Sequence, residues 1–407
     1  MKKMYFGFIT IVVFMALSLA ACPEGDSGSS SSSPQPPPPI VTNNLKELGE
    51  NLTKRGKNTA DKPVQVKLNG LNLDTNWTEL LKVLDTADRY VDLDISECTG
   101  MTTFAPGAKN TGEKMIVSLV LPKTTETISA GTDVPQFLFF SSLRKIKGTE
   151  ITEVGDYSFY NTKTLSAIDF PVLNTIGEYA FAYSGLTGVT IPAGVSTVKT
   201  HAFYGCTGLT SLIIFEDGLE TIESYAFYAA RITSLTIPDS VTNIEENAFA
   251  QCASLTGITI GGGLENMDGF VFGDYQKLEA INVSEDNMEY SSQNGVLYNS
   301  AANALIRYPA GKKGAFTVPD GVTSIKNAAF SGCTGLTGVT IGADITGIEN
   351  YAFEGCSGLT SVTFKKNTLL FNNTAFPGDL FDKFITEGIG TYTRPNGNTM
   401  EWTKQGN

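Results

Sequence analysis

Hydrophobic positions recur along this chain with a period of 22 to 24 residues over much of its length. Each repeat holds a phenylalanine, usually preceded by alanine and followed by a Leu-x-x-hydrophobic-x-hydrophobic run. The phenylalanines in this slot are Phe159, Phe181, Phe203, Phe227, Phe249, Phe272, Phe330, Phe353 and Phe376. A fixed period in this range is typical of solenoids, in which each repeat buries its apolar side only against its neighbours. The pattern therefore predicts a β-rich repeat solenoid.

Within one repeat, short apolar runs separated by Gly and Asp predict two extended segments joined by turns. In the repeat from Ala202 to Ile222, the side chains expected to point inward are Phe203, Leu209, Leu212, Ile214, Leu219 and Ile222. Threonine is frequent at the alternate strand positions, which we expect to face solvent, and its preference for strands explains its use there. Adjacent coils should lie about 4.8 Å apart.

Both ends of the repeat region depart from this pattern, as terminal repeats do when they cap a stack. Residues 41–150 are predicted to form an N-terminal cap and degenerate first coils, before the clear repeats at 151–376. In the cap, the apolar spacing from Trp77 to Leu84 predicts a short helix capped by Thr75 or Asn76. The alternation from Val91 to Ile95 predicts a strand.

The phenylalanine rhythm breaks between Phe272 and Phe330, where we expect a hairpin inserted near 284–314. Arg307, Lys312 and Lys313 make this insertion locally basic. Residues 377–407 should form a C-terminal cap, because the segments 391–394 and 400–403, joined through a Pro-Asn-Gly turn, read as a second hairpin. Such a hairpin would protect the open edge of the last coil.

The first residues read as an export signal. Lys2 and Lys3 precede an apolar run that is short for a membrane span, and Leu-Ala-Ala-Cys ends it at Cys22. This ending resembles a bacterial lipobox, which implies a lipoprotein signal peptide at 1–21 and lipidation of Cys22. Residues 22–40 are rich in Ser and Pro and are predicted to form a tether. An uncleaved anchor or a secreted protein with a free Cys22 fits the pattern less well.

Charge and cysteine content narrow the functional classes. The net charge is −13, and its scattered basic residues argue against nucleic-acid binding, which needs clustered Lys and Arg. The cysteines that share one repeat slot are Cys206, Cys252, Cys333 and Cys356. That pattern indicates small buried thiols. Whether Cys333 and Cys356 form a disulfide is left open by the sequence, since spacing alone does not establish disulfide geometry.

The full repeat, Ile-x-x-x-Ala-Phe-x-x-Cys-x-x-Leu-x-x-Val-x-Ile-Pro-x-x-Val, resembles the BspA-like leucine-rich-repeat family of bacterial surface proteins over about 151–376. The resemblance implies a right-handed leucine-rich-repeat stack of coils with an N-terminal cap and a C-terminal hairpin cap. Members are usually cell-surface or outer-membrane proteins. Some are adhesins for host matrix proteins such as fibronectin or fibrinogen, and others are coaggregation factors. The family offers no catalytic residues to carry over.

Candidate chemistry is sparse. The chain has one histidine, His201, in a repeat slot where other copies hold tyrosine or asparagine, so we interpret it as an ordinary flanking residue rather than a catalytic base. The cysteines lie a coil apart, which is unsuitable for a metal site. We predict no enzymatic activity, no cofactor and no bound metal.

Tyrosines cluster on either side of the phenylalanine slot and form the one constellation that favours binding. The candidate ligand-binding residues are Tyr179, Tyr183, Tyr204, Tyr225 and Tyr228. Tyrosine offers a large contact area at modest entropic cost and is enriched in binding hot spots. The alternative is that these rings only pack on neighbouring coils.

These features predict an exported, lipid-anchored surface protein of the outer membrane that binds macromolecules without catalysis. Its expected partner is a protein of the host matrix or of another bacterial surface. The alternative is a structural or scaffolding envelope protein, in the periplasm or a surface layer, with no host ligand.

Overall fold

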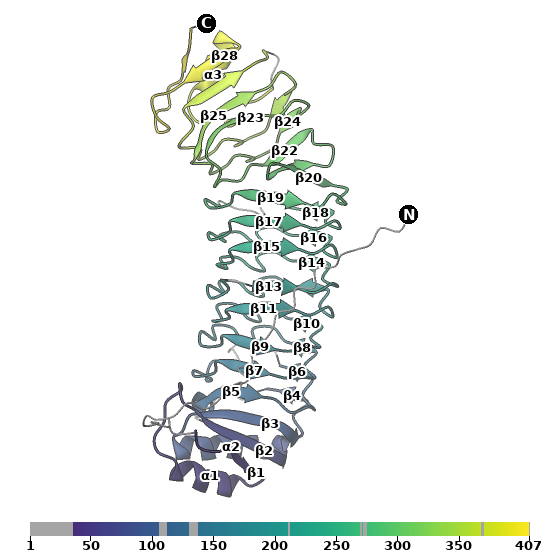
Figure 1. The fold of residues 1–407 in the computed structure, drawn as a ribbon, viewed down its shortest axis with the longest axis vertical. Helices are drawn as coiled ribbons and strands as arrows, with labels where there is room; N and C mark the ends of the chain where they lie inside the picture. The colour runs from purple at the N-terminus through teal and green to yellow at the C-terminus, as the bar shows by residue number, and fades with distance from the viewer. Residues whose placement is uncertain are drawn as a thin grey trace, which may run out of the picture. The chain divides into compact units, whose positions relative to one another are not determined.

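In a computed structural model, the described residues are 36–105, 112–129, 137–210, 212–268, 271, 275–367 and 370–406. The predictions for the signal peptide, for Cys22 and for Phe272 fall outside these residues. The chain divides into two units after Pro38, of which Pro39–Asn407 is compact. All named helices and strands belong to the second unit, whose coils are drawn in Figure 1.

The N-terminal cap consists of two helices packed on the first strands of a parallel sheet. Its elements are β1 (Ile40–Thr42), α1 (Leu45–Lys54), β2 (Val64–Asn72), α2 (Leu73–Ala87) and β3 (Val91–Thr99). The predicted strand is present as β3 and the predicted helix as α2. Its expected cap at Thr75 or Asn76 is wrong: the Asn72 side chain accepts a hydrogen bond from the Asp74 N–H at 3.0 Å. The helix begins earlier because Leu73, directly after β2, is buried with Trp77.

Beyond the cap the chain winds into a parallel β-solenoid. The registers Ile176↔Val198 and Val198↔Ile222 correspond to coils of 22 and 24 residues. Two sides of each coil carry strands, visible as two columns of arrows in Figure 1. One column contains β5 (Ile116–Val120), β7 (Lys145–Lys147), β9 (Ala167–Asp169), β11 (Gly188–Ile191), β13 (Leu212–Phe215), β15 (Ser234–Ile237), β17 (Gly257–Ile260) and β19 (Ala280–Val283). The solenoid predicted from the sequence is thereby confirmed.

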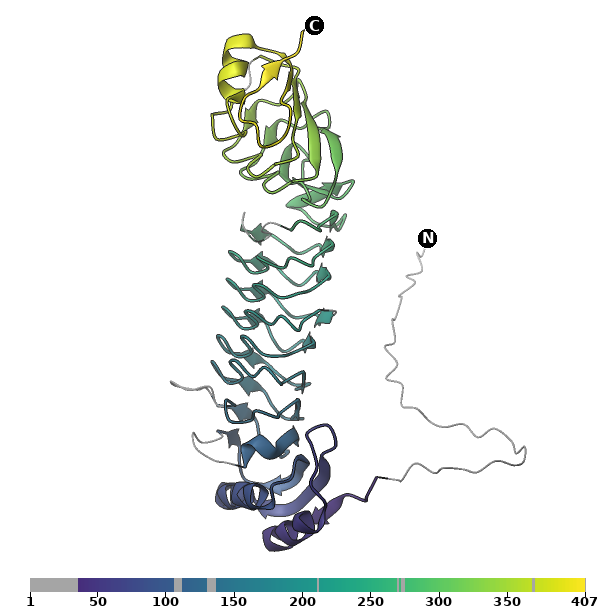
Figure 2. The same cartoon turned by 90° about the vertical axis from the view of Figure 1, so that its left-hand side faces the viewer.

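The other column is a continuous eight-stranded sheet of two-residue strands among the described residues. Its members are β4 (Thr103–Phe104), β6 (Thr127–Ile128), β8 (Glu153–Val154), β10 (Thr175–Ile176), β12 (Thr197–Val198), β14 (Thr221–Ile222), β16 (Asn243–Ile244) and β18 (Asn266–Met267). A short 3₁₀ helix, η1 (Glu113–Met115), precedes β5. Figure 2 shows the coils from a second side.

One inward position was predicted incorrectly. Ile214 faces solvent with 37% of its surface exposed, while Ile213 and Phe215 pack against the core. The pairing Thr190↔Ile214 places it opposite an outward threonine of the preceding coil. The longer spacing between Phe203 and Phe227 shifts the strand register by one residue, and a one-residue shift moves a side chain to the other face of a sheet.

A third side of each coil, the arc, joins a two-residue strand to the next strand of the first column. The arcs carry the repeated phenylalanines, which form a buried column as predicted. Successive ring centroids from Phe159 to Phe249 are 5.1, 5.3, 5.1 and 5.4 Å apart, with nearly parallel planes. These five rings are fully buried. The column therefore joins neighbouring coils through their largest apolar side chains.

The repeat cysteines each follow the phenylalanine of their own coil by three residues and are buried. The thiols of Cys206, Cys252 and Cys356 donate to the carbonyls of Phe181, Phe227 and Phe330 in the preceding coil, at 3.0, 3.4 and 3.1 Å. Cys333 and Cys356 are buried, and no disulfide joins them. Burial raises the pKa of Cys206 to about 11 and that of Cys252 to about 12, so these groups stay protonated and link coils.

An antiparallel segment follows β19 and interrupts both strand columns. It consists of β20 (Tyr290–Gln293), β21 (Val296–Asn299) and β22 (Ala304–Arg307). Parallel stacking then resumes with β23 (Gly314–Thr317), β24 (Ser324–Ile325), β25 (Leu336–Ile341), β26 (Gly347–Ile348) and β27 (Ser361–Phe364). The buried apolar side chains form two clusters, one from Ile40 to Leu297 and one from Val296 to Trp402. They meet at β21, whose successive side chains point to opposite faces.

The C-terminal end is closed by α3 (Leu380–Glu387), β28 (Gly390–Thr393) and β29 (Thr403–Lys404). The predicted hairpin is present, because β28 pairs antiparallel with β29 and also with β27. Helix α3 was not predicted from the sequence; it is an eight-residue helix with no side-chain hydrogen bond at its Asp379 N-cap. Arg394 donates to the carbonyls of Leu359, Cys356 and Thr399, at 2.7, 3.3 and 2.9 Å. The bonds to Leu359 and Cys356 satisfy buried carbonyls of the last coil, and the bond to Thr399 joins them to the C-terminal cap.

Candidate functional site: a tyrosine face on the arcs

Aromatic side chains in front of the phenylalanine column form a continuous surface over four consecutive arcs. We call it the tyrosine face and define it by Tyr157, Tyr160, Tyr179, Tyr183, His201, Tyr204, Tyr225 and Tyr228. All five candidate binding residues from the sequence lie in it. Tyr351, in the same repeat slot, lies beyond the antiparallel segment and is outside the face. The face therefore collects the candidates from separate coils into one surface.

The first ring column of the face runs through Tyr157, Tyr179, His201 and Tyr225. Successive ring centroids are 4.8, 4.4 and 5.0 Å apart, and their planes are within 9° of parallel. The Tyr225 hydroxyl then accepts a hydrogen bond from the Asn247 amide at 3.0 Å. His201 is thus part of the face, and its description as an ordinary flanking residue missed this. The available signal was the repeat slot that it shares with Tyr179 and Tyr225.

The second ring column runs through Tyr160, Tyr183, Tyr204 and Tyr228. Tyr204 and Tyr228 stack with centroids 4.8 Å apart, whereas Tyr183 is nearly perpendicular to Tyr160 and strongly tilted against Tyr204, at 86° and 70°. Tyr183 differs because it comes four positions after the first-column tyrosine of its own arc instead of three. Its ring covers Gly205, where an added Cβ would meet ring carbons at 2.7 Å. This change of orientation makes a step in the surface.

The backbone that carries the first column is strained. Tyr157, Tyr179, His201 and Tyr225 have φ angles of 55°, 52°, 58° and 59°, in the left-handed region. This conformation costs roughly 1–2 kcal/mol for residues other than Gly, Asn and Asp. The same slot holds Asn247 and Ala328 in other coils, so the fold does not require an aromatic ring there. The repeated use of tyrosine at a costly position points to a role for the rings themselves.

Backbone polar groups of the face are already paired. The N–H groups of Tyr157, Phe159 and Asn161 donate to carbonyls of the next arc at 2.9, 2.7 and 2.8 Å. The N–H groups of Tyr179 and Tyr183 do the same at 3.3 and 2.7 Å. A ligand on this surface would therefore contact side chains rather than an open strand edge.

The side chains at the centre of the tyrosine face are uncharged. Burial raises the pKa of Tyr179 and of Tyr204, so both hydroxyls remain neutral donors at physiological pH. Burial lowers the pKa of His201, and the nearby Glu178 carboxylate opposes that shift only in part. The imidazole is therefore held mainly as the neutral form, which stacks between two tyrosines.

Acidic side chains next to the face fall into two groups. Glu223 accepts from the Thr200 N–H and hydroxyl at 2.8 and 2.9 Å, and Glu245 accepts from the same two groups of Ser224 at 3.0 Å each. Both carboxylates thus serve the fold. Glu178 and Glu246 are exposed and present negative charge at the border of the face.

The comparisons with known proteins agree with this repeat architecture. The model of the BspA type leucine rich repeat region matches in six copies, over residues 112–174, 174–301 and 312–387. The chain belongs to the BspA-type leucine-rich-repeat family. This confirms the resemblance carried by the repeat sequence. No curated protein matches the chain.

Several solved structures are similar to this BspA-type chain. The pneumococcal vaccine antigen PcpA is 20% identical, with a TM-score of 0.39 over 68% of this chain and 57% of its own. A leucine rich cell surface protein from Faecalibacterium prausnitzii is 24% identical, with a TM-score of 0.43 over 62% of this chain and 70% of its own. A leucine-rich repeat protein from Bacteroides ovatus is 19% identical, with a TM-score of 0.39 over 66% of this chain and 81% of its own.

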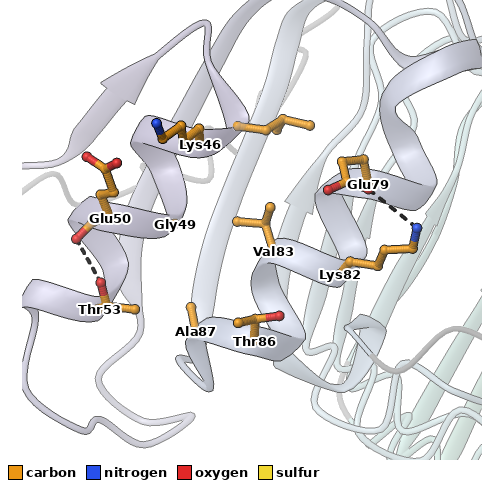
Figure 3. A pocket seen from close by; sticks show the side chains of 10 residues that line it. Lys46, Gly49, Glu50, Thr53, Glu79, Lys82, Val83, Thr86 and Ala87 are labelled. Atoms are coloured by element: carbon orange, nitrogen blue, oxygen red, sulfur yellow. Dashed lines mark hydrogen bonds and ion pairs between the residues drawn. The ribbon is translucent and has the colours of Figure 1, made fainter.

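A separate hollow of about 320 Å³ lies between α1 and α2 in the cap of this BspA-type chain, as Figure 3 shows. Its floor includes Leu45, Val83 and Ala87, and the Lys82 ammonium pairs with the Glu79 carboxylate at 3.4 Å on one side. No histidine or thiol lines this hollow. Its residues therefore offer a small apolar surface and no acid–base or nucleophilic group beyond exposed carboxylates and amines.

Within the part of the chain that the structure describes, no three His, Cys, Asp or Glu side chains are grouped to hold a metal ion. Among the same residues, none of the helices has the length and apolarity needed to cross a bilayer. The chemistry available on the tyrosine face is aromatic contact and hydrogen bonding by hydroxyl groups.

Proposed function

We propose that this protein is an exported, non-catalytic surface lipoprotein, anchored through Cys22, that binds macromolecules through its tyrosine face. Its partner would be a host matrix protein or a protein of another bacterial surface, so that the chain acts as an adhesin. The observation that carries the proposal is the aromatic first column, kept at backbone positions where tyrosine is costly. Membership of the BspA-type family supports a surface location.

The geometry suits binding in two ways. Tyrosine rings provide large, rigid contact areas, and their hydroxyl groups add directional hydrogen bonds. Many copies on one cell would raise avidity by roughly 10²–10⁴ when several engage the same target. The domain organisation we propose for this role has a signal peptide at 1–21, a tether at 22–40, a cap with first coils at 41–150, the repeat body at 151–376 and a C-terminal cap at 377–407.

Protease shaving of intact cells tests the surface location. The expected result is loss of the protein from intact cells, with a lysed sample as the control for cleavability. Cleavage only after lysis would contradict the adhesin role and favour a structural or scaffolding protein of the envelope. A Cys22→Ser variant should lose lipid labelling and be released from the membrane fraction.

Substitution within the face tests the binding site. The variant Tyr179→Asn plus Tyr225→Asn replaces two strained tyrosines by the residue that the chain itself uses at position 247. We expect binding of immobilised matrix proteins or of partner cells to fall at least about tenfold, because hot-spot rings typically contribute over 1 kcal/mol each. Thermal stability should stay close to that of the wild type, since asparagine tolerates the left-handed conformation.

The matched control is Tyr351→Asn. Tyr351 has the same repeat slot, a φ of 57° and 48% exposure, but it lies outside the face. The Tyr351→Asn variant should bind like the wild type. Equal binding by the double variant and this control would remove the tyrosine face as the site.

A further inference from the structure

The surface of the tyrosine face also restricts the kind of polypeptide that can bind it; this inference rests on the proposed function. The arc N–H groups are bonded to the next coil, with the Phe181 and Phe203 N–H groups donating at 2.9 and 2.8 Å to the carbonyls of Ala202 and Ala226. A β-strand that bound here would find no unpaired backbone N–H groups on the arcs to pair with, and its own N–H groups would lack backbone acceptors. Burying such groups unpaired is unfavourable. A partner with few N–H groups avoids this cost.

The spacing of the rings fits one extended conformation closely. Successive rings of the first column are 4.4 to 5.0 Å apart. Two coils therefore advance by about 9.6 Å, using about 4.8 Å for each coil. A polyproline II helix has three residues per turn and a rise of about 3.1 Å per residue, so it advances about 9.3 Å per turn. Every third residue of such a helix, lying along the stack, would meet an equivalent position on every second arc.

In the second ring column, the position of the tyrosine alternates in the same way over its first three arcs. Tyr160 and Tyr204 hold the same slot two arcs apart, while the intermediate arc has Ala182 in that slot and places Tyr183 next to it. Tyr183 is 41% exposed and does not stack on either neighbouring ring. Over the first three arcs the ring orientation thus alternates, whereas Tyr228 in the fourth arc stacks parallel on Tyr204 at 4.8 Å. Aromatic surfaces with hydroxyl donors are the common binding platform for proline-rich segments, whose carbonyls accept hydrogen bonds.

Charge at the border adds a second requirement. Glu178 and Glu246 are exposed at two levels of the face, with Glu246 also accepting from the Asn247 amide at 2.9 Å. The carboxylates of Glu223 and Glu245 are occupied by backbone and hydroxyl donors. Exposed carboxylates beside an aromatic surface favour a partner that carries lysine or arginine. We propose that the tyrosine face recognises a proline-rich segment in the polyproline II conformation, flanked by basic residues.

The test uses the full-length protein and a fluorescent peptide of ten prolines with an arginine at each end. The comparison peptide has the same arginines and length but alternates glycine and serine. We expect fluorescence anisotropy to show at least about tenfold tighter binding of the proline peptide, because it is already ordered before binding. Equal binding of the two peptides would overturn the proposal.

Three variants locate the interaction on the face. Tyr183→Ala plus Tyr204→Ala should weaken binding of the proline peptide at least about tenfold, whereas Tyr351→Ala should leave it unchanged. Glu178→Gln plus Glu246→Gln should weaken binding and reduce its dependence on salt. Unfolding curves of each variant establish that it is folded. Undiminished binding by the double tyrosine variant would show that the peptide binds elsewhere and would overturn the assignment.

The result is separable from the proposed function. If the tyrosine variants stop binding matrix proteins or cells but the wild type ignores the proline peptide, the adhesive face stands and the proline-rich partner is wrong. If the variants keep both activities, the proposed site itself is wrong.

Discussion

At the scale of single residues, the first ring column shows how the repeat uses strained backbone. The left-handed slot is satisfied by Asn247 or Ala328 in some coils and by Tyr157, Tyr179 and Tyr225 in others. Stacking at about 5 Å offsets part of the strain, since each such aromatic pair contributes roughly 0.5–1.5 kcal/mol beyond its buried area. The residue choice at this slot is thus governed by what the side chain contacts and by what it presents to solvent.

His201 should make stability depend on pH. It packs between Tyr179 and Tyr225, beside Tyr204, and burial lowers its pKa below 6.5, although the Glu178 carboxylate acts in the opposite direction. Below pH 6.5 the His201 imidazole binds a proton in the unfolded chain, whereas in the folded chain it stays mostly unprotonated until the pH reaches its lower pKa. The free energy of unfolding therefore falls as the pH drops from about 6.5 to the folded pKa, and this contribution is then constant.

Denaturant unfolding at pH 7.5 and 5.5 measures this effect, and His201 is the only histidine of the chain. The variant His201→Tyr, which carries the residue of the arcs on either side, should lose less stability than the wild type between the two pH values. An equal loss in both proteins would show that other groups cause the pH dependence.

At the scale of elements, the two strand columns and the arcs are each only a few residues wide, so an element is stable only through the coil above and below. The ends of the stack need special devices for this reason. At the N-terminal end α1 and α2 cover the apolar side, with Leu80, Leu81 and Leu84 buried. At the C-terminal end Arg394 binds three carbonyls and lies over the Trp402 ring at 4.7 Å.

Replacing Arg394 by methionine should destabilise the C-terminal coils. The change leaves buried carbonyls of Leu359 and Cys356 without this donor, and an unpaired buried polar group costs about 1–3 kcal/mol. The expected loss is at least about 2 kcal/mol in thermal or denaturant unfolding. Arg231→Met, at an exposed position, is the control and should change stability by less than about 0.5 kcal/mol. A matching small effect at Arg394 would contradict its role as an end cap.

At the scale of the whole molecule, the core of the described residues is two clusters joined at β21. Val296 and Tyr298 belong to the second cluster and Leu297 to the first, because alternate side chains of a strand point to opposite faces. Both strand columns also change sheet at this position. Solenoid stability is a sum of local terms, so a weak junction lets the two parts unfold separately.

Calorimetry should therefore show two unfolding transitions. Phe227→Ala opens a cavity in the first cluster and Phe353→Ala opens one in the second, each costing about 3–5 kcal/mol. Each variant should lower only one transition temperature. A single transition lowered by both variants would mean that the core unfolds as one unit, and unchanged stability in Phe227→Ala would contradict the phenylalanine column.

The sequence alone determined the solenoid, because a constant period of apolar residues can be buried only by stacking equivalent coils. It also indicated the phenylalanine column, the buried thiols and the tyrosines as candidates. The tertiary structure decided what depends on local register and backbone conformation. One extra residue between Leu209 and strand β13 turned Ile214 outward, the left-handed φ angles aligned His201 with the tyrosine rings, and the two faces of β21 divided the core. These outcomes depend on contacts between coils, which residue spacing within one repeat does not specify.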